Sequence, residues 1–317
     1  MTPATFFFRA VGFASIVLVV LLLCAWFGPH ASRVDYLEVS GAKQALLRAT
    51  ISPKVIIVGG SNATFGIDSE VLENALCMPV VNMSLHASLG FRFMVDEVKN
   101  SLGKGDLVIV SLEHSGYSIP EKDNDIHILT VDRVPSAIQF IPWYSRPRVL
   151  MGVMLMRMQA LYKVFTGAWK NASEDKVYRA SGFNERGDIV SHIGLPHRDP
   201  ARIEKVVYAT KTVSDDFYPI AQDLIDHAKN SGADVVWTWP VIATSSFRQG
   251  RNDTIAQVLA THDIELLGNS VDLVLPDTAF YDTHYHLRAV GRQIRTRQLI
   301  KDLCGKGMVK CCGGQPK

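Results

Sequence analysis

Apolar and polar residues divide the chain into one long apolar segment near its start and a series of shorter apolar runs further along. The long segment, Ala10 to Phe27, contains no charged residue and is close to the ~20 residues that a helix needs to cross a bilayer. The shorter runs alternate with stretches in which apolar residues recur at helical spacing. This alternation predicts an α/β fold with a parallel sheet.

The runs expected as strands are flanked by glycine, proline or helix-capping residues. The expected strands are 55–58, 79–83, 107–112, 233–239 and 271–275, and the expected helices are 69–77, 91–102, 214–230 and 252–262. Residues 55–58 are all β-branched and unbroken by polar residues, which is typical of a strand buried on both faces.

Residues 1–30 are predicted to be a signal anchor in the cytoplasmic membrane. Arg9 precedes the apolar run, and Pro29-His30-Ala31 does not form a small-x-small cleavage site. The prediction is a single-pass protein whose main domain lies in the periplasm or outside the cell, with cleavage of the segment as the alternative. Residues 31–53 are expected to be a juxtamembrane linker.

The α/β domain is expected over 54–303, with a largely helical insertion at 115–205 and a flexible tail at 304–317. The insertion contains an apolar segment, 149–165, with four of the nine methionines. Such a segment suits a lid, a partner surface or a membrane-lying helix, but a plain packing helix is the favoured interpretation. An insertion after the third strand is expected to overhang the active-site edge.

Ser61 follows the first expected strand directly, after Gly59 and Gly60. Neither the dinucleotide pattern G-x-G-x-x-G nor the phosphate-loop pattern fits this turn, because the required partners are absent at those spacings. The carboxyl end of a strand in an open α/β sheet is where ligands bind. Taken alone, however, a serine in this turn is most simply a turn cap.

A partner for Ser61 lies near the other end of the chain, in Phe280-Tyr-Asp-Thr-His-Tyr-His286. A serine becomes a nucleophile when an imidazole accepts its proton and a carboxylate orients that imidazole. Asp282 with His286 supplies both groups, and His284 is the alternative base. Because alternate residues of an extended segment face one side, a metal site of Asp282, His284 and His286 is a minor alternative. No metal or other cofactor is expected.

A serine after the first strand, with an aspartate and a histidine before the last helix, resembles the SGNH (GDSL-type) hydrolase family. The resemblance covers roughly 54–114 and 206–303. It is most similar to a membrane-anchored subgroup associated with bacterial exopolysaccharide clusters, related to the periplasmic alginate O-acetyltransferases. It implies a three-layer αβα sandwich and a Ser61–His286–Asp282 triad, with the oxyanion-hole candidates Ser61, Ala87, Gly90 and Asn62.

The match to the family is uneven. Gly60 stands where the family has the aspartate of Gly-Asp-Ser, and the third block lacks its asparagine, for which Asn62, Asn82 or His114 are possible substitutes. The leading hypothesis is an extracytoplasmic serine esterase or O-acyltransferase that acts on a carbohydrate polymer. The alternative is a non-catalytic carbohydrate-binding or assembly protein on a degenerate SGNH fold. The expected partners are a carbohydrate polymer or acyl donor, the membrane, and other polysaccharide-assembly proteins.

Composition removes some function classes. Lys+Arg 33 nearly balance Asp+Glu 31, and no basic run is interleaved with aromatic residues, so nucleic acid is not an expected partner. The five cysteines lack the paired spacing of a zinc site. A disulfide in the tail is compatible with a location outside the cytoplasm. Trp237 and Trp239 suit sugar stacking, but core packing is favoured.

Overall fold

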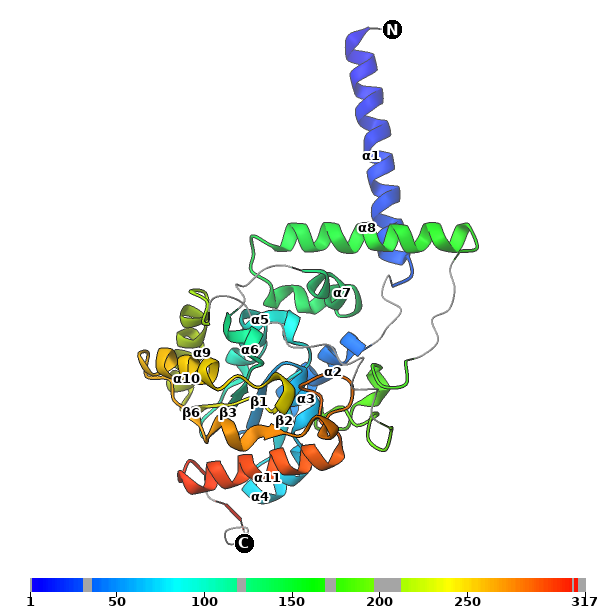
Figure 1. Ribbon diagram of the computed structural model, residues 1–317. Helices are drawn as coiled ribbons and strands as arrows, with labels where there is room; N and C mark the ends of the chain where they lie inside the picture. The colour runs from blue at the N-terminus through cyan, green and yellow to red at the C-terminus, as the bar shows by residue number, and fades with distance from the viewer. Residues whose placement is uncertain are drawn as a thin grey trace.

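The protein consists of an α/β body from which one long helix projects (Figure 1). The structure is a computed structural model that describes residues 2–30, 36–118, 124–168, 175–196, 212–309 and 311–312. The projecting helix is α1 (Pro3–Phe27). Within it, the 21-residue segment Pro3–Leu23, which includes Arg9, is long and apolar enough to cross a membrane, and it is not buried against the body.

The body is built on a parallel sheet of five strands in the order β2-β1-β3-β4-β6, which confirms the predicted mixed α/β class with a parallel sheet. The strands are β1 (Val55–Gly59), β2 (Val80–Asn82), β3 (Leu107–Ser111), β4 (Asp234–Thr238) and β6 (Leu266–Leu267). The register places Gly59 of β1 beside Ser111 of β3. The carboxyl ends of these two central strands therefore meet at one edge.

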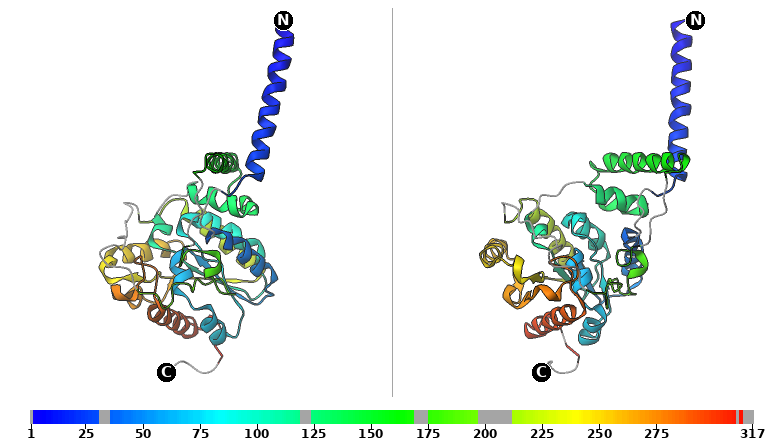
Figure 2. Two further views of the ribbon diagram at one scale, coloured as in Figure 1. Left: turned by 90° about the vertical axis from the view of Figure 1, so that its right-hand side faces the viewer. Right: turned by 45° about the vertical axis from the view of Figure 1, so that its right-hand side comes forward.

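Helices pack on both faces of the sheet, because successive strand residues point to opposite sides. Ile56 and Val58 belong to a core shared with α2 (Val39–Ala49), α5 (Gly90–Val98) and α9 (Phe217–Ser231). Val55 and Ile57 belong to a second core shared with α4 (Ser69–Leu76) and α11 (Ala289–Gly305). The views in Figures 1 and 2 show α4 and α11 together on the side away from α1.

One predicted strand is wrong. Residues 270–273 form a 3-10 helix, η8 (Ser270–Leu273), because the side chain of Asn269 caps it by accepting a hydrogen bond from the amide of Val271 at 3.2 Å. Only β7 (Val274–Leu275) remains extended, and it pairs with β5 (Ile242–Ala243) in a separate two-stranded sheet. The fifth strand of the main sheet is instead β6, a run too short to be recognised as a strand.

The predicted linker at 31–53 is wrong for its described part, 36–53, because this segment belongs to the body. Tyr36 in η1 (Tyr36–Glu38) and Leu47 in α2 are buried in the main core. Lys43 of α2 donates hydrogen bonds to the carbonyl oxygens of Asn82 (2.9 Å) and Gly187 (2.6 Å), and burial lowers its pKa to about 7. The sequence indicated a helix here but did not indicate its partners.

The segment between β3 and α9 is helical over its first part. It contains α6 (His114–Ser118), α7 (Asp125–Arg133), η4 (Pro135–Phe140) and α8 (Arg146–Phe165). Residues 175–196 then return to the body, where the buried carboxylate of Asp188 accepts hydrogen bonds from Ser69, Asn82 and Arg292 at 2.5–3.0 Å. The rest of the predicted insertion, 197–205, lies outside the described residues.

The predicted flexible tail is tied down where it is described. Disulfides join Cys304 to Cys311 and Cys77 to Cys312, so the chain after α11 is held against the end of α4. Residues 310 and 313–317 lie outside the described residues. Trp237 and Trp239 are both buried in the main core, as favoured from the sequence. The remaining helices are α3 (Ser61–Gly66) and α10 (Gln249–Ala260).

Candidate active site

Ser61 is the first residue of α3, at the point where β1 ends. Gly60 is the extended residue before this helix, and Gly59 lies beside Ser111 of β3. A side chain at Gly59 would collide with the Ser111 carbonyl, and one at Gly60 would collide with the carboxylate of Glu113. Two glycines are needed because the end of β3 approaches the turn this closely. Ser61 is partly exposed.

Glu113 supports the Ser61 turn from the neighbouring strand. It follows β3, and its side chain is buried. Its Oε1 accepts a hydrogen bond from the amide of Asn62 at 2.8 Å and one from the Ser61 hydroxyl at 3.4 Å. The turn therefore has an anionic side chain beneath it, although Gly60 supplies none.

Asp282 and His286 form a buried pair on one hairpin-like loop. His286 Nδ1 and Asp282 Oδ1 are 2.8 Å apart. The loop closes through two backbone hydrogen bonds, from the Tyr281 amide to the His286 carbonyl and from the Arg288 amide to the Ala279 carbonyl, both 2.8 Å. At its tip, the Thr283 hydroxyl accepts the amide of His286 at 3.1 Å. This bend brings residues 282 and 286 together, four positions apart.

Tyr178 completes the support of this pair from the segment that follows α8. Its hydroxyl donates to Asp282 Oδ2 at 2.6 Å and lies 3.1 Å from His286 Nδ1. The imidazole of His286 also stacks on the ring of Phe65, with centroids 4.0 Å apart and planes inclined by 4°. The imidazole is thus held by a carboxylate, a hydroxyl and an aromatic face.

Phe65 links the two halves of the site. It lies four residues after Ser61 on α3, and residues so spaced are neighbours on one face of a helix. Among the described residues, however, no hydrogen bond joins Ser61 to His286, and none involves His286 Nε2. The structure therefore joins Asp282 with His286 and Ser61 with Glu113, while Phe65 connects one pair to the other.

The oxyanion-hole candidates differ in whether their donors are already engaged. The Asn62 side chain exchanges hydrogen bonds with Ser111, at 3.0 Å to its carbonyl and 3.1 Å from its hydroxyl. The Gly90 amide donates to the Ala87 carbonyl. For the Ser61 and Ala87 amides, by contrast, no hydrogen-bond acceptor is found in the described part of the chain. These two remain as candidates.

The residues considered as substitutes for the missing asparagine have structural partners. Asn82 contacts Asp188 at 2.8 Å and accepts the Ser84 amide at 3.1 Å. The His114 ring lies between the Tyr285 hydroxyl and the Asn252 side chain, each at 2.8 Å. Neither side chain is therefore poised to donate to an oxyanion.

His284 is oriented differently from His286. Its Nδ1 is hydrogen-bonded to the hydroxyl of Ser246, and its carbonyl accepts the amide of Ala243 at 3.1 Å. The bend at 282–286 thus corrects the idea of an extended segment in which both histidines face one side. The described residues contain no cluster of three His, Cys, Asp or Glu side chains suited to a metal ion.

Charges around the site also affect Tyr36 and His86. Burial, with the negative charges of Glu113 and Asp282, raises the pKa of Tyr36 above its ordinary value, and its hydroxyl donates to the Leu85 carbonyl at 2.7 Å. Burial and the positive charge of His286 lower the pKa of His86 to about 4.

Sequence reasoning missed Glu113, Tyr178 and Tyr36. A signal existed for Glu113, since it directly follows the expected strand 107–112 and the neighbouring turn has glycine where a carboxylate was expected. No such signal existed for Tyr178, whose approach to Asp282 depends on how a distant segment returns to the sheet. Tyr36 was assigned to the linker.

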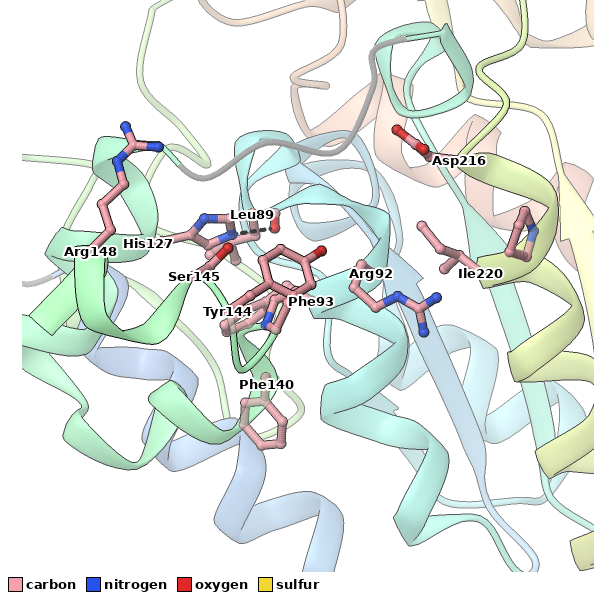
Figure 3. Close-up of a pocket in the computed structure, with 12 residues that line it drawn as sticks. Leu89, Arg92, Phe93, His127, Phe140, Tyr144, Ser145, Arg148, Asp216 and Ile220 are labelled. Atoms are coloured by element: carbon pink, nitrogen blue, oxygen red, sulfur yellow. Dashed lines mark hydrogen bonds between the residues drawn. The ribbon is translucent and has the colours of Figure 1, made fainter.

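A cavity of about 590 Å³ lies away from Ser61 and His286, between α5, the start of α8 and α9. Figure 3 shows the side chains around it, which include Arg92, His127, Tyr144 and Arg148. Arg92 is paired with Asp223 at 2.8 Å. None of the proposed catalytic residues lines this cavity. Their assignment therefore depends only on the geometry at the carboxyl end of β1.

Comparison with known proteins does not assign the chain to a family. No protein-family model matches the sequence, and no curated protein matches it. Among solved structures, it is similar to the crystal structure of protein YxiM from Bacillus subtilis, with 12% identity and a TM-score of 0.38. The match covers 81% of this chain and 58% of that chain. A similarity of this size carries no argument about fold or function.

Proposed function

We propose that the protein is a membrane-anchored, extracytoplasmic serine esterase or O-acyltransferase of the SGNH type, acting on acyl esters of a carbohydrate polymer. The observation that carries the proposal is the Asp282–His286 pair, whose ring stacks on Phe65 of the helix that begins with Ser61. Helices on both faces of the parallel sheet agree with an SGNH-like sandwich.

The proposed chemistry assigns one role to each group. His286 Nε2 accepts the proton of Ser61 as Oγ attacks the ester carbonyl, and Asp282 on Nδ1 orients the ring and stabilises its positive charge. The amides of Ser61 and Ala87 donate to the oxyanion. His286 then gives the proton to the leaving alcohol, and water or a sugar hydroxyl releases the acyl group from Ser61.

For this step the Ser61 hydroxyl must rotate from Glu113 towards His286. A rotation about one side-chain bond is a small change, and hydrogen bonds of catalytic groups are often long before substrate binds. Glu113 serves in this proposal as the support of the turn, because its stronger hydrogen bond is to the amide of Asn62.

Two observations support the proposed location. Helix α1 is suited to anchor the chain, and two disulfides are expected mainly in proteins outside the reducing cytoplasm. The acyl-ester chemistry and the carbohydrate class of the substrate come from the sequence resemblance to the SGNH family.

A non-catalytic binding or assembly protein is the second candidate. It is favoured by the hydrogen bond of Ser61 to Glu113 and the absence, among the described residues, of one to His286. In this alternative the polar groups at the β1 edge hold a carbohydrate without reacting with it.

Pre-steady-state kinetics separates the two candidates. The full-length protein in detergent is mixed with an activated acetyl ester, and the burst of released alcohol is followed for wild type, Ser61→Ala, His286→Ala and the matched control His284→Ala. The esterase proposal predicts that the first two variants lose on the order of 10⁴-fold in rate and that the control stays active. No burst from the folded wild type would favour the binding protein.

A further inference from the structure

Helix α8 has apolar side chains on two opposite faces. One face contacts the body and α1, and there Val149 and Ala160 are 1% and 3% exposed. The opposite face carries Leu155, Tyr162 and Phe165, which are 49%, 69% and 81% exposed. A packing helix of a water-soluble surface has polar residues on its outer face. The outer face of α8 therefore calls for a second apolar environment.

The position of α8 relative to α1 indicates what that environment is. In Figures 1 and 2, α8 lies across the direction of α1, at the end of α1 that joins the body. If α1 crosses a bilayer, its axis runs along the membrane normal, and α8 then lies along the membrane surface. Its outer face is thus at the level where α1 leaves the membrane.

The junction between the two helices is held by specific contacts. Arg157 of α8 donates to Asp132 of α7 at 2.6 Å and to the Trp26 carbonyl of α1 at 3.3 Å. His30, just after α1, lies 2.9 Å from the Asp132 carbonyl. These contacts join α1, α7 and α8, so the orientation of α8 follows that of the anchor.

The residue types around α8 suit the headgroup region. The helix has no acidic residue, and besides Arg157, which is paired with Asp132, it has the basic residues Arg146, Arg148 and Lys163. Trp143 and Tyr144, directly before it, are 77% and 70% exposed, as is Trp26 at 77% at the end of α1. Tryptophan and tyrosine rings favour the membrane–water boundary, and basic side chains favour anionic lipid.

We infer that α8 is an interfacial membrane helix, which binds the surface of the same phospholipid bilayer that α1 spans through the face of Leu155, Tyr162 and Phe165. The favoured interpretation from the sequence, a plain packing helix, accounts for only one of its two apolar faces. This inference depends on α1 being the anchor but is independent of the reaction at Ser61.

Nitroxide accessibility in nanodiscs tests this inference. The full-length Cys24→Ser protein is reconstituted into phosphatidylcholine–phosphatidylglycerol nanodiscs, with a spin label at Leu155→Cys or, in a second variant, at Tyr162→Cys. The control is Val290→Cys on α11, which is 68% exposed and on the side of the body away from α1. Accessibility is measured to oxygen, which partitions into lipid, and to a water-soluble nickel chelate.

We expect the labels at 155 and 162 to be more accessible to oxygen than to the chelate, and the label at 290 to show the reverse. Chelate accessibility at 155 and 162 equal to that at 290 would overturn the inference. Labels at 155 and 162 that are shielded from both reagents would overturn it as well, because the face would then be covered by another protein or a second copy of the chain.

Discussion

The carboxylate of Glu113 lies in the space that a side chain at Gly60 would need. It accepts the amide of Asn62 at 2.8 Å and so anchors the turn that presents Ser61. In the SGNH resemblance the turn has its own aspartate at this position. Here the acidic side chain comes instead from Glu113, after the neighbouring strand β3. Positions 60 and 113 are coupled, because the site has no room for a side chain at 60 together with the carboxylate of Glu113.

This coupling predicts the effect of adding a side chain at position 60. Gly60→Ala should lower the free energy of unfolding by about 1–3 kcal/mol, since the methyl group must displace a buried carboxylate. Removing the Glu113 carboxylate as well makes room for the methyl group. The loss of unfolding free energy in the double variant Gly60→Ala/Glu113→Ala should therefore be smaller than the sum of the losses in the two single variants. Chemical denaturation of the detergent-solubilised protein measures both.

The matched control is Gly250→Ala on α10, where no atom lies within 4 Å of the added methyl group. Because alanine favours helix, this control should be neutral or slightly stabilising. Equal stability of the Gly60→Ala and Gly250→Ala variants would show that Glu113 does not occupy the site.

Tyr178→Phe tests whether the hydroxyl on Asp282 positions the His286 ring. The change removes a hydrogen bond of 2.6 Å to a carboxylate, a kind of bond worth about 1.5–3 kcal/mol. We expect the acylation rate with an activated ester to fall by roughly 10- to 100-fold, and the melting temperature to fall by a few degrees because the same hydrogen bond also stabilises the fold. Tyr162→Phe, on the outer face of α8, is the control. An unchanged acylation rate in Tyr178→Phe would remove this residue from the site.

Much of the sheet could be predicted, because strands such as β1 and β3 are unbroken apolar runs bounded by turn residues. The strand β6 could not, since two leucines give no periodicity, and the strand expected at 271–275 failed because a local side-chain cap at Asn269 favours a 3-10 helix. The role of Tyr36 and α2 in the core was also out of reach, since helical spacing does not reveal what a helix packs against.

At the site, the structure places Ser61 at the end of β1 and pairs Asp282 with His286, while the catalytic role of these three residues stays a prediction. Sequence order was not enough to separate the two histidines by geometry. The bend made by Thr283 turns His284 to Ser246 and His286 to Asp282, and such a bend depends on hydrogen bonds that residue spacing does not encode. The hydrogen bond of Tyr178 to Asp282 could not be predicted for the same reason.

Buried histidines predict acid sensitivity. Burial lowers the pKa of His114 and of His192 to about 4, below the ordinary 6.5. Between these values the unfolded chain binds more protons than the folded one, so stability falls as pH falls from about 6.5 towards 4. Each histidine should contribute a slope of about 1.4 kcal/mol per pH unit.

Denaturation midpoints between pH 7 and pH 4.5 measure this slope. In the structure, His192 Nε2 lies 2.8 Å from the Leu287 carbonyl, and His192→Gln keeps a hydrogen-bond donor for that carbonyl. This variant should reduce the slope of stability against pH by the contribution of one histidine. Stability that stays constant or rises over this range would contradict the assignment of neutral, buried imidazoles.

The two disulfides should differ in their contribution to stability. The Cys77–Cys312 bridge spans 235 residues and the Cys304–Cys311 bridge spans 7. If restriction of the unfolded chain dominates, the long bridge should contribute about 5 kcal/mol and the short one about 2 kcal/mol. Denaturation of the double variants Cys77→Ser/Cys312→Ser and Cys304→Ser/Cys311→Ser makes the comparison. A larger loss in the second variant would contradict this ranking.

Covalent labelling of Ser61 is the most direct measurement of the central claim. Membranes containing the full-length protein are treated with a fluorophosphonate, and the modified peptide is identified by mass spectrometry in wild type, His286→Ala and His284→Ala. The account predicts a phosphonate on Ser61 in wild type and His284→Ala, and its loss in His286→Ala. A folded wild-type protein that is unlabelled, or that is labelled at Ser246 beside His284 rather than at Ser61, would contradict it.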